Sequence, residues 1–310
     1  MNNINELYKK YKSSNSKWII SQITNNHSEY QSRANFINIS NKFLATPENT
    51  PILYHYTTYE SLKKIIETNE FLLGSIKEMN DSEEIKHTFD LGRIILKELG
   101  ATQDEIKSFN EIFLAKFVQY DTYLISFTKN NSSMAMQKYG DVALEFKLSE
   151  VQGVLAEKFT PKNFELKSGD AYVFPMIVNY DEEFQKRWLY PIVKMILFCI
   201  RNTEIEDYII NYYLYSSMYS FYVLSLCFKR HIIHEENEIR ILVLRKVTHG
   251  ESHEEKILNE KPRIVMPLNY QLIKKVIANR SWYGKLPVIN NLLSANDFVD
   301  TKVELTKLPY

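Results

Sequence analysis

The irregular order of strand-like and helix-like segments is the feature that most constrains the fold of this chain. Short runs rich in β-branched and aromatic residues, such as ILYHY at 52–56 and EIRILVLRKV at 238–247, predict strands. These strands come in pairs, and no regular β–α–β alternation connects them. Such an order is typical of α+β proteins. The sequence therefore predicts an α+β fold with a mixed, mainly antiparallel sheet.

The chain is expected to form one large domain with helical additions. Its 310 residues are 45% hydrophobic, which is enough to bury a sizeable core. Residues 1–50 are polar and helix-like, and Pro47 and Pro51 mark a boundary at their end. Residues 51–310 are expected to form a single α+β domain with a helical insertion at about 181–228.

Composition and motifs argue against several kinds of site. With 38 basic and 38 acidic residues, the chain has no global field that would attract nucleic acid or an acidic membrane. Its eight glycines form no GxGxxG or GxxxxGK[ST] phosphate-binding motif. Cys199 and Cys227 predict neither a disulfide framework nor a metal site, and His231 and His234 lack further ligands at metal-binding spacing. No metal is therefore expected.

Residues 208–228 carry no charge and are long enough to span a bilayer. The segment nevertheless contains six tyrosines, four serines and an asparagine, many of them at its centre. We therefore expect a buried helix or helix pair and no membrane partner. The N-terminus lacks the apolar core of a signal peptide, so the cytoplasm is the expected compartment.

His55 closes the first predicted strand, directly before a helix. Because side chains alternate along a strand, Leu53, His55 and Thr57 share one face. His55 could point into a cleft or could be a structural residue bonded to the backbone, and the strand alone leaves both open. Thr57 and Glu60 have the spacing of a capping box that would begin the helix.

A second group of polar residues precedes and enters the strand that begins at Glu238. Glu236, Glu238 and Arg240 follow every second position, so two carboxylates face one guanidinium. One interpretation is an exposed ladder of charges, which contributes little to stability. The other is a catalytic acid or a ribose-binding group at the mouth of an apolar strand.

Two loops carry further candidates. Asp81 and Glu84 have the spacing of a helix N-cap with its reciprocal glutamate, and Asn80 would shape the turn. The free N–H groups of a helix N-terminus also suit a phosphate. Ser126 and Tyr139 border a polar loop between two predicted strands.

Several motifs in a fixed order resemble a bacterial family known as domain of unknown function 2971. They are LYHYTTYESLKKII, MNDSEE, YLISFT, YGDVALEF, FKRHIIHEENEIRIL, IKKVIANR and VELTKLPY. The resemblance covers residues 52–310. The chain departs from the family at Ser82, where a proline is usual, at MAMQKYG, where a tryptophan is expected, and at Ile239, where an aromatic residue is common.

That family resembles, more remotely, the ADP-ribosyltransferase superfamily. HYTTYESLKKII is similar to its opening strand and helix, and NEIRILVL to the later strand that begins at the catalytic glutamate. The resemblance implies a split sheet and NAD as the substrate bound in its cleft. It also implies a toxin or anti-phage defence effector that transfers ADP-ribose to a macromolecule, either nucleic acid or protein, or that hydrolyses NAD outright as an NAD glycohydrolase. Cofactor contacts are implied for His55, Tyr56, Thr57, Asn80, Asp81, Ser126, Tyr139 and Arg240.

The resemblance also implies individual roles. His55 would hold the NAD ribose and carboxamide, and Tyr139 would stack on nicotinamide. Glu238 would bond the ribose hydroxyl and stabilise the oxocarbenium-like transition state. Glu236 would orient the acceptor nucleophile, and Arg240 would steady a carboxylate or a cofactor phosphate.

These roles require Glu238 and His55 to face one cleft. Placement on opposite faces, or more than about 15 Å apart, is incompatible with one nicotinamide site, because pockets for such ligands are compact. Two other functions stay open. One is a metal-dependent nuclease or phosphoesterase that uses Glu236, Glu238, Asp81 and His55. The other is a non-catalytic module that senses a nucleotide or a phage protein. The oligomeric state, including a homo-oligomer, is also left open.

Overall fold

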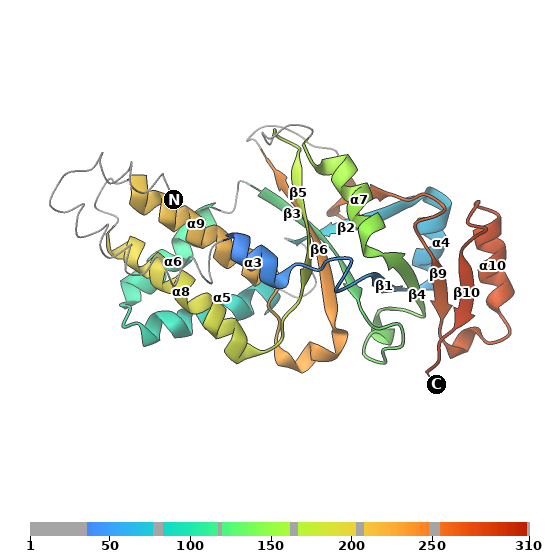
Figure 1. Ribbon diagram of the computed structural model, residues 1–310, viewed down its shortest axis with the longest axis horizontal. Helices are drawn as coiled ribbons and strands as arrows, with labels where there is room; N and C mark the ends of the chain where they lie inside the picture. Colours follow the sequence, from blue (N-terminus) through green and yellow to red (C-terminus); the bar gives the residue numbers. More distant parts are fainter. Residues whose placement is uncertain are drawn as a thin grey trace. The chain divides into compact units, whose positions relative to one another are not determined.

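The computed structural model describes residues 36–76, 83–116, 120–161, 167–202, 208–247 and 255–308 (Figure 1). The chain divides into two compact units. The described residues of the first unit fall within 1–42, 84–114 and 181–228, and those of the second within 43–83, 115–180 and 229–310.

The first unit is helical. Its helices are α3 (Phe36–Phe43), α5 (Glu83–Glu98), α6 (Gln103–Lys116), α8 (Glu182–Arg201) and α9 (Tyr208–Ser225). Edge-to-face contacts among Phe89, Phe109 and Phe221 join α5, α6 and α9, with ring centroids 5.3–6.0 Å apart. The tyrosine-rich segment thus buries one side of a helix inside this unit. Within the described chain, no helix combines the length and apolar character needed to cross a bilayer.

The second unit is built on one ten-stranded sheet. Its strands are β1 (Ile52–Thr57), β2 (Glu70–Ser75), β3 (Tyr120–Thr128), β4 (Val142–Lys147), β5 (Ala171–Ile177), β6 (Glu238–Lys246), β7 (Lys256–Leu258), β8 (Lys261–Pro267), β9 (Lys275–Ala278) and β10 (Lys302–Leu305). Among the described strands, β9 and β10 pair in parallel and all other pairs are antiparallel. The predicted α+β class with a mixed, mainly antiparallel sheet is confirmed.

The two faces of this sheet carry different side chains. On one face, Leu53, Phe127, Leu144 and Ile239 belong to a large apolar core. Helices α4 (Tyr59–Thr68), α7 (Leu148–Phe159) and α10 (Leu286–Ser294) pack their apolar residues into the same core. On the other face, a smaller cluster forms around Tyr54, Tyr56, Ala143, Ile277 and Met136.

The sheet forks at β3. One edge of β3 pairs with β6 along its whole length, from Tyr120 to Thr128. The other edge is shared, because β1 pairs at Thr128 and β2 pairs at Leu124 and Tyr123. The strands β1 and β2 therefore part beside residues 125–127 of β3.

Two local features of the structure differ from the sequence analysis. The N-cap of α4 is Thr58, whose hydroxyl accepts the Ser61 N–H at 3.2 Å, and the predicted pair of Thr57 and Glu60 is one residue out of place. Helix α7 was not predicted. Its N-cap, Lys147, makes no side-chain capping bond, so the usual sequence signal of a helix start is missing.

Candidate functional site

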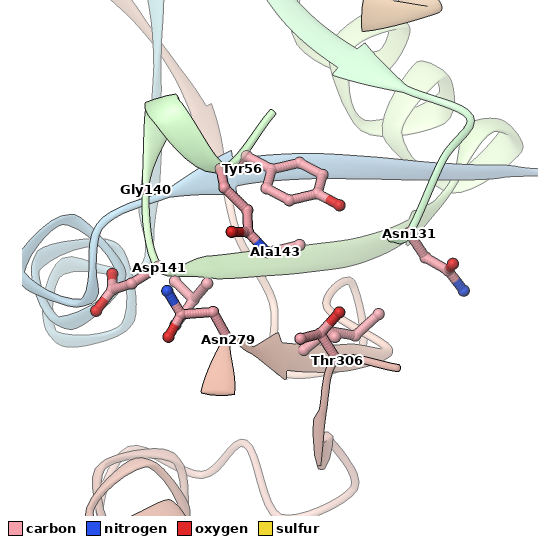
Figure 2. Close-up of a pocket in the computed structure, with 10 residues that line it drawn as sticks. Tyr56, Asn131, Gly140, Asp141, Ala143, Asn279 and Thr306 are labelled. Atoms are coloured by element: carbon pink, nitrogen blue, oxygen red, sulfur yellow. The ribbon is translucent and has the colours of Figure 1, made fainter. Parts of the chain in front are cut away.

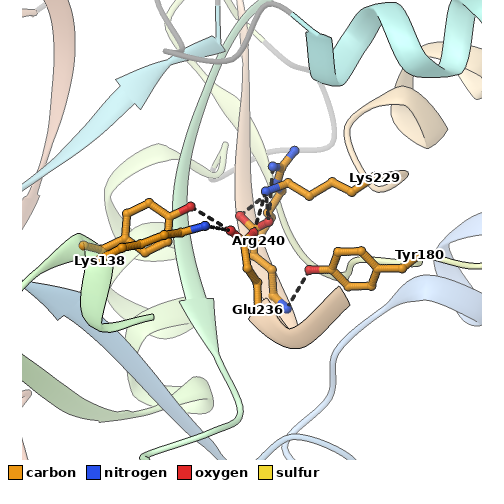
Figure 3. A network of polar contacts seen from close by, with 7 residues as sticks. Lys138, Tyr180, Lys229, Glu236 and Arg240 are labelled. Carbon is orange, nitrogen blue, oxygen red and sulfur yellow. Dashed lines mark hydrogen bonds and ion pairs between the residues drawn. The ribbon is translucent and has the colours of Figure 1, made fainter. Parts of the chain in front are cut away.

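A buried cluster of charges lies where β6 begins (Figure 3). It contains Glu236, Glu238, Arg240 and Lys229, whose residues are only 1–6% exposed. The Lys229 Nζ lies 2.7 Å from Glu238 Oε2 and 3.0 Å from Glu236 Oε2. The Arg240 Nε donates to Glu238 Oε1 at 2.9 Å, so both oxygens of Glu238 are held by cations.

The backbone brings the two glutamates together by a turn and not by strand alternation. Glu236 ends the 3₁₀ turn η4 (His231–Glu236), and Asn237 follows in the left-handed region with φ 43°. Asparagine tolerates this conformation better than most residues. Glu238 and Arg240 then lie on one face of β6, two residues apart. The predicted line of three residues is thus a turn followed by a strand.

These charges are not an exposed ladder. Every residue of β6 from Glu238 to Arg245 is buried, so both faces of the strand are covered. The interpretation of this strand as having one solvated face is wrong. A buried ionised group is costly unless it is paired and hydrogen-bonded, which is the state of all four members of the cluster.

Side chains from two other segments complete the cluster. The short turn η3 (Gln137–Tyr139) supplies Lys138 and Tyr139, whose Nζ and hydroxyl lie 2.9 and 2.7 Å from Glu236 Oε1. The Tyr180 hydroxyl accepts the backbone N–H of Glu238 at 3.1 Å. Lys138 and Tyr139 are about half exposed, so the cluster reaches solvent on this side.

The surrounding cations keep both carboxylates ionised. Burial alone would raise the pKa of Glu238, but Arg240 and Lys229 outweigh it and lower the pKa to about 2. For Glu236, burial is likewise outweighed by Lys229, together with the hydrogen bonds from Lys138 and Tyr139, so its pKa is also lowered. Burial and the nearby Glu238 carboxylate raise the pKa of Tyr180, which stays a neutral phenol.

His55 lies elsewhere, at the fork of the sheet. Its Nδ1 is 2.8 Å from the Ser126 carbonyl oxygen, in the stretch of β3 that neither β1 nor β2 pairs. Its ring packs edge-on against Phe71 of β2 and Phe127 of β3, at centroid distances of 4.8 and 5.9 Å. Burial lowers the pKa of His55, so the ring is neutral near pH 7 and Nδ1–H donates to the carbonyl. His55 thus fills the gap between the diverging strands.

The sheet places His55 and Glu238 on opposite faces. Thr128 pairs with Tyr54 on β1 and with Glu238 on β6, so those three residues share a face. His55, one residue along, lies on the other face with Phe127 and the apolar core. The expectation that His55 and Glu238 face one cleft is therefore wrong. The alternation of side chains along each strand can be read from the sequence. Which face of β1 coincides with which face of β6 is decided by the register of both strands against β3.

The other described residues predicted to contact the cofactor lie in different places and form no single site. The Tyr56 hydroxyl donates to the Asn130 carbonyl at 3.3 Å and accepts the Ser133 N–H at 3.1 Å, which anchors the loop after β3. Ser126 meets His55 through its carbonyl. Thr57 is buried and lies directly under Gly140. Asn80 and Asp81 lie outside the described residues.

A small hollow lies beside Tyr56, between the loop after β3 and the C-terminal strands (Figure 2). Asp141 and Asn279 line it, and its cavity volume is about 10 Å³. That is roughly the room that one water molecule needs. Neither Glu238 nor His55 lines it, so this hollow is not the predicted nicotinamide cleft.

Lys229, Lys138 and Tyr180 were assigned no role from the sequence. Lys229 is seven residues before Glu236, at the end of an apolar segment where an ammonium group looks like a helix-terminal charge. A basic residue directly after the uncharged run 208–228 was the available signal. As for metal ligands, no group of three or more His, Cys, Asp or Glu side chains among the described residues could hold an ion.

No family model, no curated protein and no solved structure matches the chain. The resemblance to domain of unknown function 2971 and to the ADP-ribosyltransferases therefore stays a prediction from the motifs.

Proposed function

We propose that this protein consumes NAD in the manner of an ADP-ribosyltransferase, with Glu238 as the catalytic carboxylate. The observation that carries the proposal is a buried carboxylate at the mouth of β6 that two cations keep ionised and oriented. Fixed negative charge in a dry site is suited to stabilise a positive charge that develops only in the transition state. The forked sheet is in keeping with the split sheet that the resemblance implies.

The reaction breaks the bond between the ribose C1′ and the nicotinamide nitrogen. The bonding electrons leave with nicotinamide, which departs neutral, and the ribose acquires oxocarbenium character beside Glu238. A hydroxyl or amine of the acceptor, or water, then bonds to C1′ and gives up its proton. Glu236, held on the same ammonium group as Glu238, is the second carboxylate near the reacting carbon.

Two features of the structure refine the proposal. Glu238 is almost fully buried, so a substrate reaches it only when covering side chains move, and the exposed members of the cluster are Lys138 and Tyr139. His55 is assigned no contact with NAD, because it lies on the other face of the sheet and is bonded to the backbone. A nicotinamide site that contains both residues is therefore excluded, and the proposal keeps Glu238 alone.

The test is release of nicotinamide from NAD, followed by chromatography, with DNA, RNA and protein acceptors and with water alone. The wild-type protein is expected to release nicotinamide, and Glu238→Gln to reduce the rate by about 10²–10³-fold, the usual loss for one electrostatic contact in a site. Glu235→Gln is the matched control, since Glu235 is an exposed glutamate on η4, three residues before Glu238. Release that survives Glu238→Gln, or its absence from the wild type with every acceptor, would contradict the proposal.

A non-catalytic sensing module is the second candidate. The observation that favours it is that each carboxylate of the cluster is already bound by cations, as in a structural ion network. A sensing module predicts that Glu238→Gln leaves the protein's effect in cells intact, provided that the variant folds.

A further inference from the structure

We infer that Lys229 is a positioning residue, whose ammonium group holds the Glu238 carboxylate in place and ties it to Glu236. The role of Lys229 in catalysis rests on the proposed function, whereas its hold on the two carboxylates is a property of the fold.

Both the backbone and the ammonium group of Lys229 are held by polar contacts. Its backbone N–H donates to the Asn179 carbonyl at 3.1 Å, directly before Tyr180. Its Nζ reaches Glu238 Oε2 at 2.7 Å and Glu236 Oε2 at 3.0 Å. One ammonium group thus bridges a carboxylate on β6 and a carboxylate on η4.

The other two cations approach the glutamates from different elements. Arg240 pairs with Glu238 from the same strand, and Lys138 pairs with Glu236 from η3. Lys138 is 53% exposed, so water screens its charge, whereas Lys229 is 6% exposed. Lys229 therefore lowers the repulsion between the two buried carboxylates, because its ammonium group contacts both of them.

Removal of that charge has a defined consequence. Two carboxylates that share a dry site cannot both stay ionised easily, and one of them takes up a proton at higher pH. In the described part of the chain, Arg240 and Tyr180 would still act on Glu238, and Lys138, Tyr139 and Tyr180 would still act on Glu236. The two carboxylates would also face each other without the shared ammonium group. Glu238 would then be less ionised and less firmly oriented.

The experiment compares Lys229→Met, which keeps length but removes charge, with Lys229→Arg, which keeps charge. Lys138→Met is the control at the exposed end of the cluster. The first readout is the ¹³C NMR titration of the Glu238 carboxyl, assigned by its loss in Glu238→Gln. We expect Lys229→Met to raise the titration midpoint of Glu238 by about 1–3 pH units. Lys229→Arg should keep the midpoint close to that of the wild type, and Lys138→Met should change it little.

The second readout is the pH profile of nicotinamide release. We expect Lys229→Met to lower kcat by about 10–100-fold, the usual result of a misplaced catalytic group, with a smaller change in KM for NAD. The acidic limb of the pH profile of Lys229→Met should move to higher pH together with the NMR titration midpoint of Glu238.

The NMR titration tests whether Lys229 controls the ionisation of Glu238, and the pH profile tests whether this matters for NAD cleavage. An unchanged Glu238 midpoint in Lys229→Met would overturn the inference, whether or not the protein cleaves NAD. A midpoint that moves and is restored by Lys229→Arg supports it, and the absence of nicotinamide release from the wild type would then defeat the proposed function alone. If Lys229→Met does not fold, the double variant Lys229→Met/Glu236→Gln removes one charge of each sign. Its comparison with Glu236→Gln measures the direct effect of Lys229 on Glu238, and an unchanged midpoint there would also overturn the inference.

Discussion

At the scale of single residues, this protein places four charged side chains where apolar ones would be expected. Glu238 and Arg240 are two positions apart on a strand in which five of the other seven residues are aliphatic. The network of Lys229, Glu236 and Glu238 compensates the loss of hydration through ion pairs of 2.7–3.0 Å. Loss of one partner leaves the others buried without compensation, which makes the cluster sensitive to substitution.

Glu238→Ala is expected to lower the free energy of unfolding by about 3–5 kcal/mol, because it leaves Lys229 and Arg240 as buried cations with one carboxylate fewer. Urea denaturation measures the change. The control Glu235→Ala, at the exposed neighbour, should stay within about 0.5 kcal/mol of the wild type. Equal effects of the two substitutions would show that the cluster is solvated.

Stability should fall in acid because of the same carboxylate. The folded pKa of Glu238 is about 2, below the ordinary 4.5, so its contribution is fully present above about pH 4.5 and is lost as pH falls toward 2. We expect the free energy of unfolding to decrease more steeply over this range in the wild type than in Glu238→Gln. Parallel curves for the two proteins would contradict the low pKa.

At the scale of elements, the loop between β3 and β4 is held at several points. Tyr56 anchors its beginning, and Glu236 anchors η3 through Lys138 and Tyr139. Its last turn passes so close to β1 that a Cβ on Gly140 would lie 2.0 Å from the Thr57 carbonyl. Only glycine fits there, since the opposing atoms belong to the backbone.

Gly140→Ala is expected to destabilise the protein by about 1–3 kcal/mol, because the loop must move away from β1. Thermal unfolding measures this effect. Gly153→Ala is the matched control: Gly153 lies inside α7 with nothing within 4 Å of a new Cβ, and alanine there should add about 0.5–1 kcal/mol of stability. A neutral Gly140→Ala would mean that the loop is less tightly packed.

The fork of the sheet explains the place of His55. A histidine near the end of the first strand can be recognised from the sequence, but its partner is a carbonyl 71 residues away on β3. That carbonyl needs a donor because β1 and β2 separate beside it. The structural role that the strand alone left open is the one that the contacts of His55 support.

At the scale of the molecule, residues from distant parts of the chain form each unit. The sequence predicted a helical segment at residues 1–50 and a helical insertion at about 181–228. In the structure, the helices of 181–228 form one unit with those of 84–114, two stretches that the sequence did not connect. Their association depends on contacts between apolar faces, which periodicity within each helix does not specify.

Both cysteines belong to this helical unit and are fully buried as free thiols. Burial raises the pKa of Cys199 to about 12, which further suppresses its reactive thiolate. We expect Ellman's reagent to label neither thiol in the native protein within minutes and both thiols in 6 M guanidinium chloride, at roughly full stoichiometry. Rapid labelling of one cysteine without denaturant would show that its helix opens in the native state.

The sequence by itself determined the α+β class, most strands and the presence of charged residues at the start of β6. These features follow from local periodicity, which each segment carries independently of its neighbours. Only the tertiary structure decided that Glu238 and His55 lie on opposite faces, that both faces of β6 are buried and that Lys229 joins the two glutamates. The physical reason is that strand register and long-range ion pairs depend on how separate elements align. A shift of one residue in register would have reversed which side chains meet.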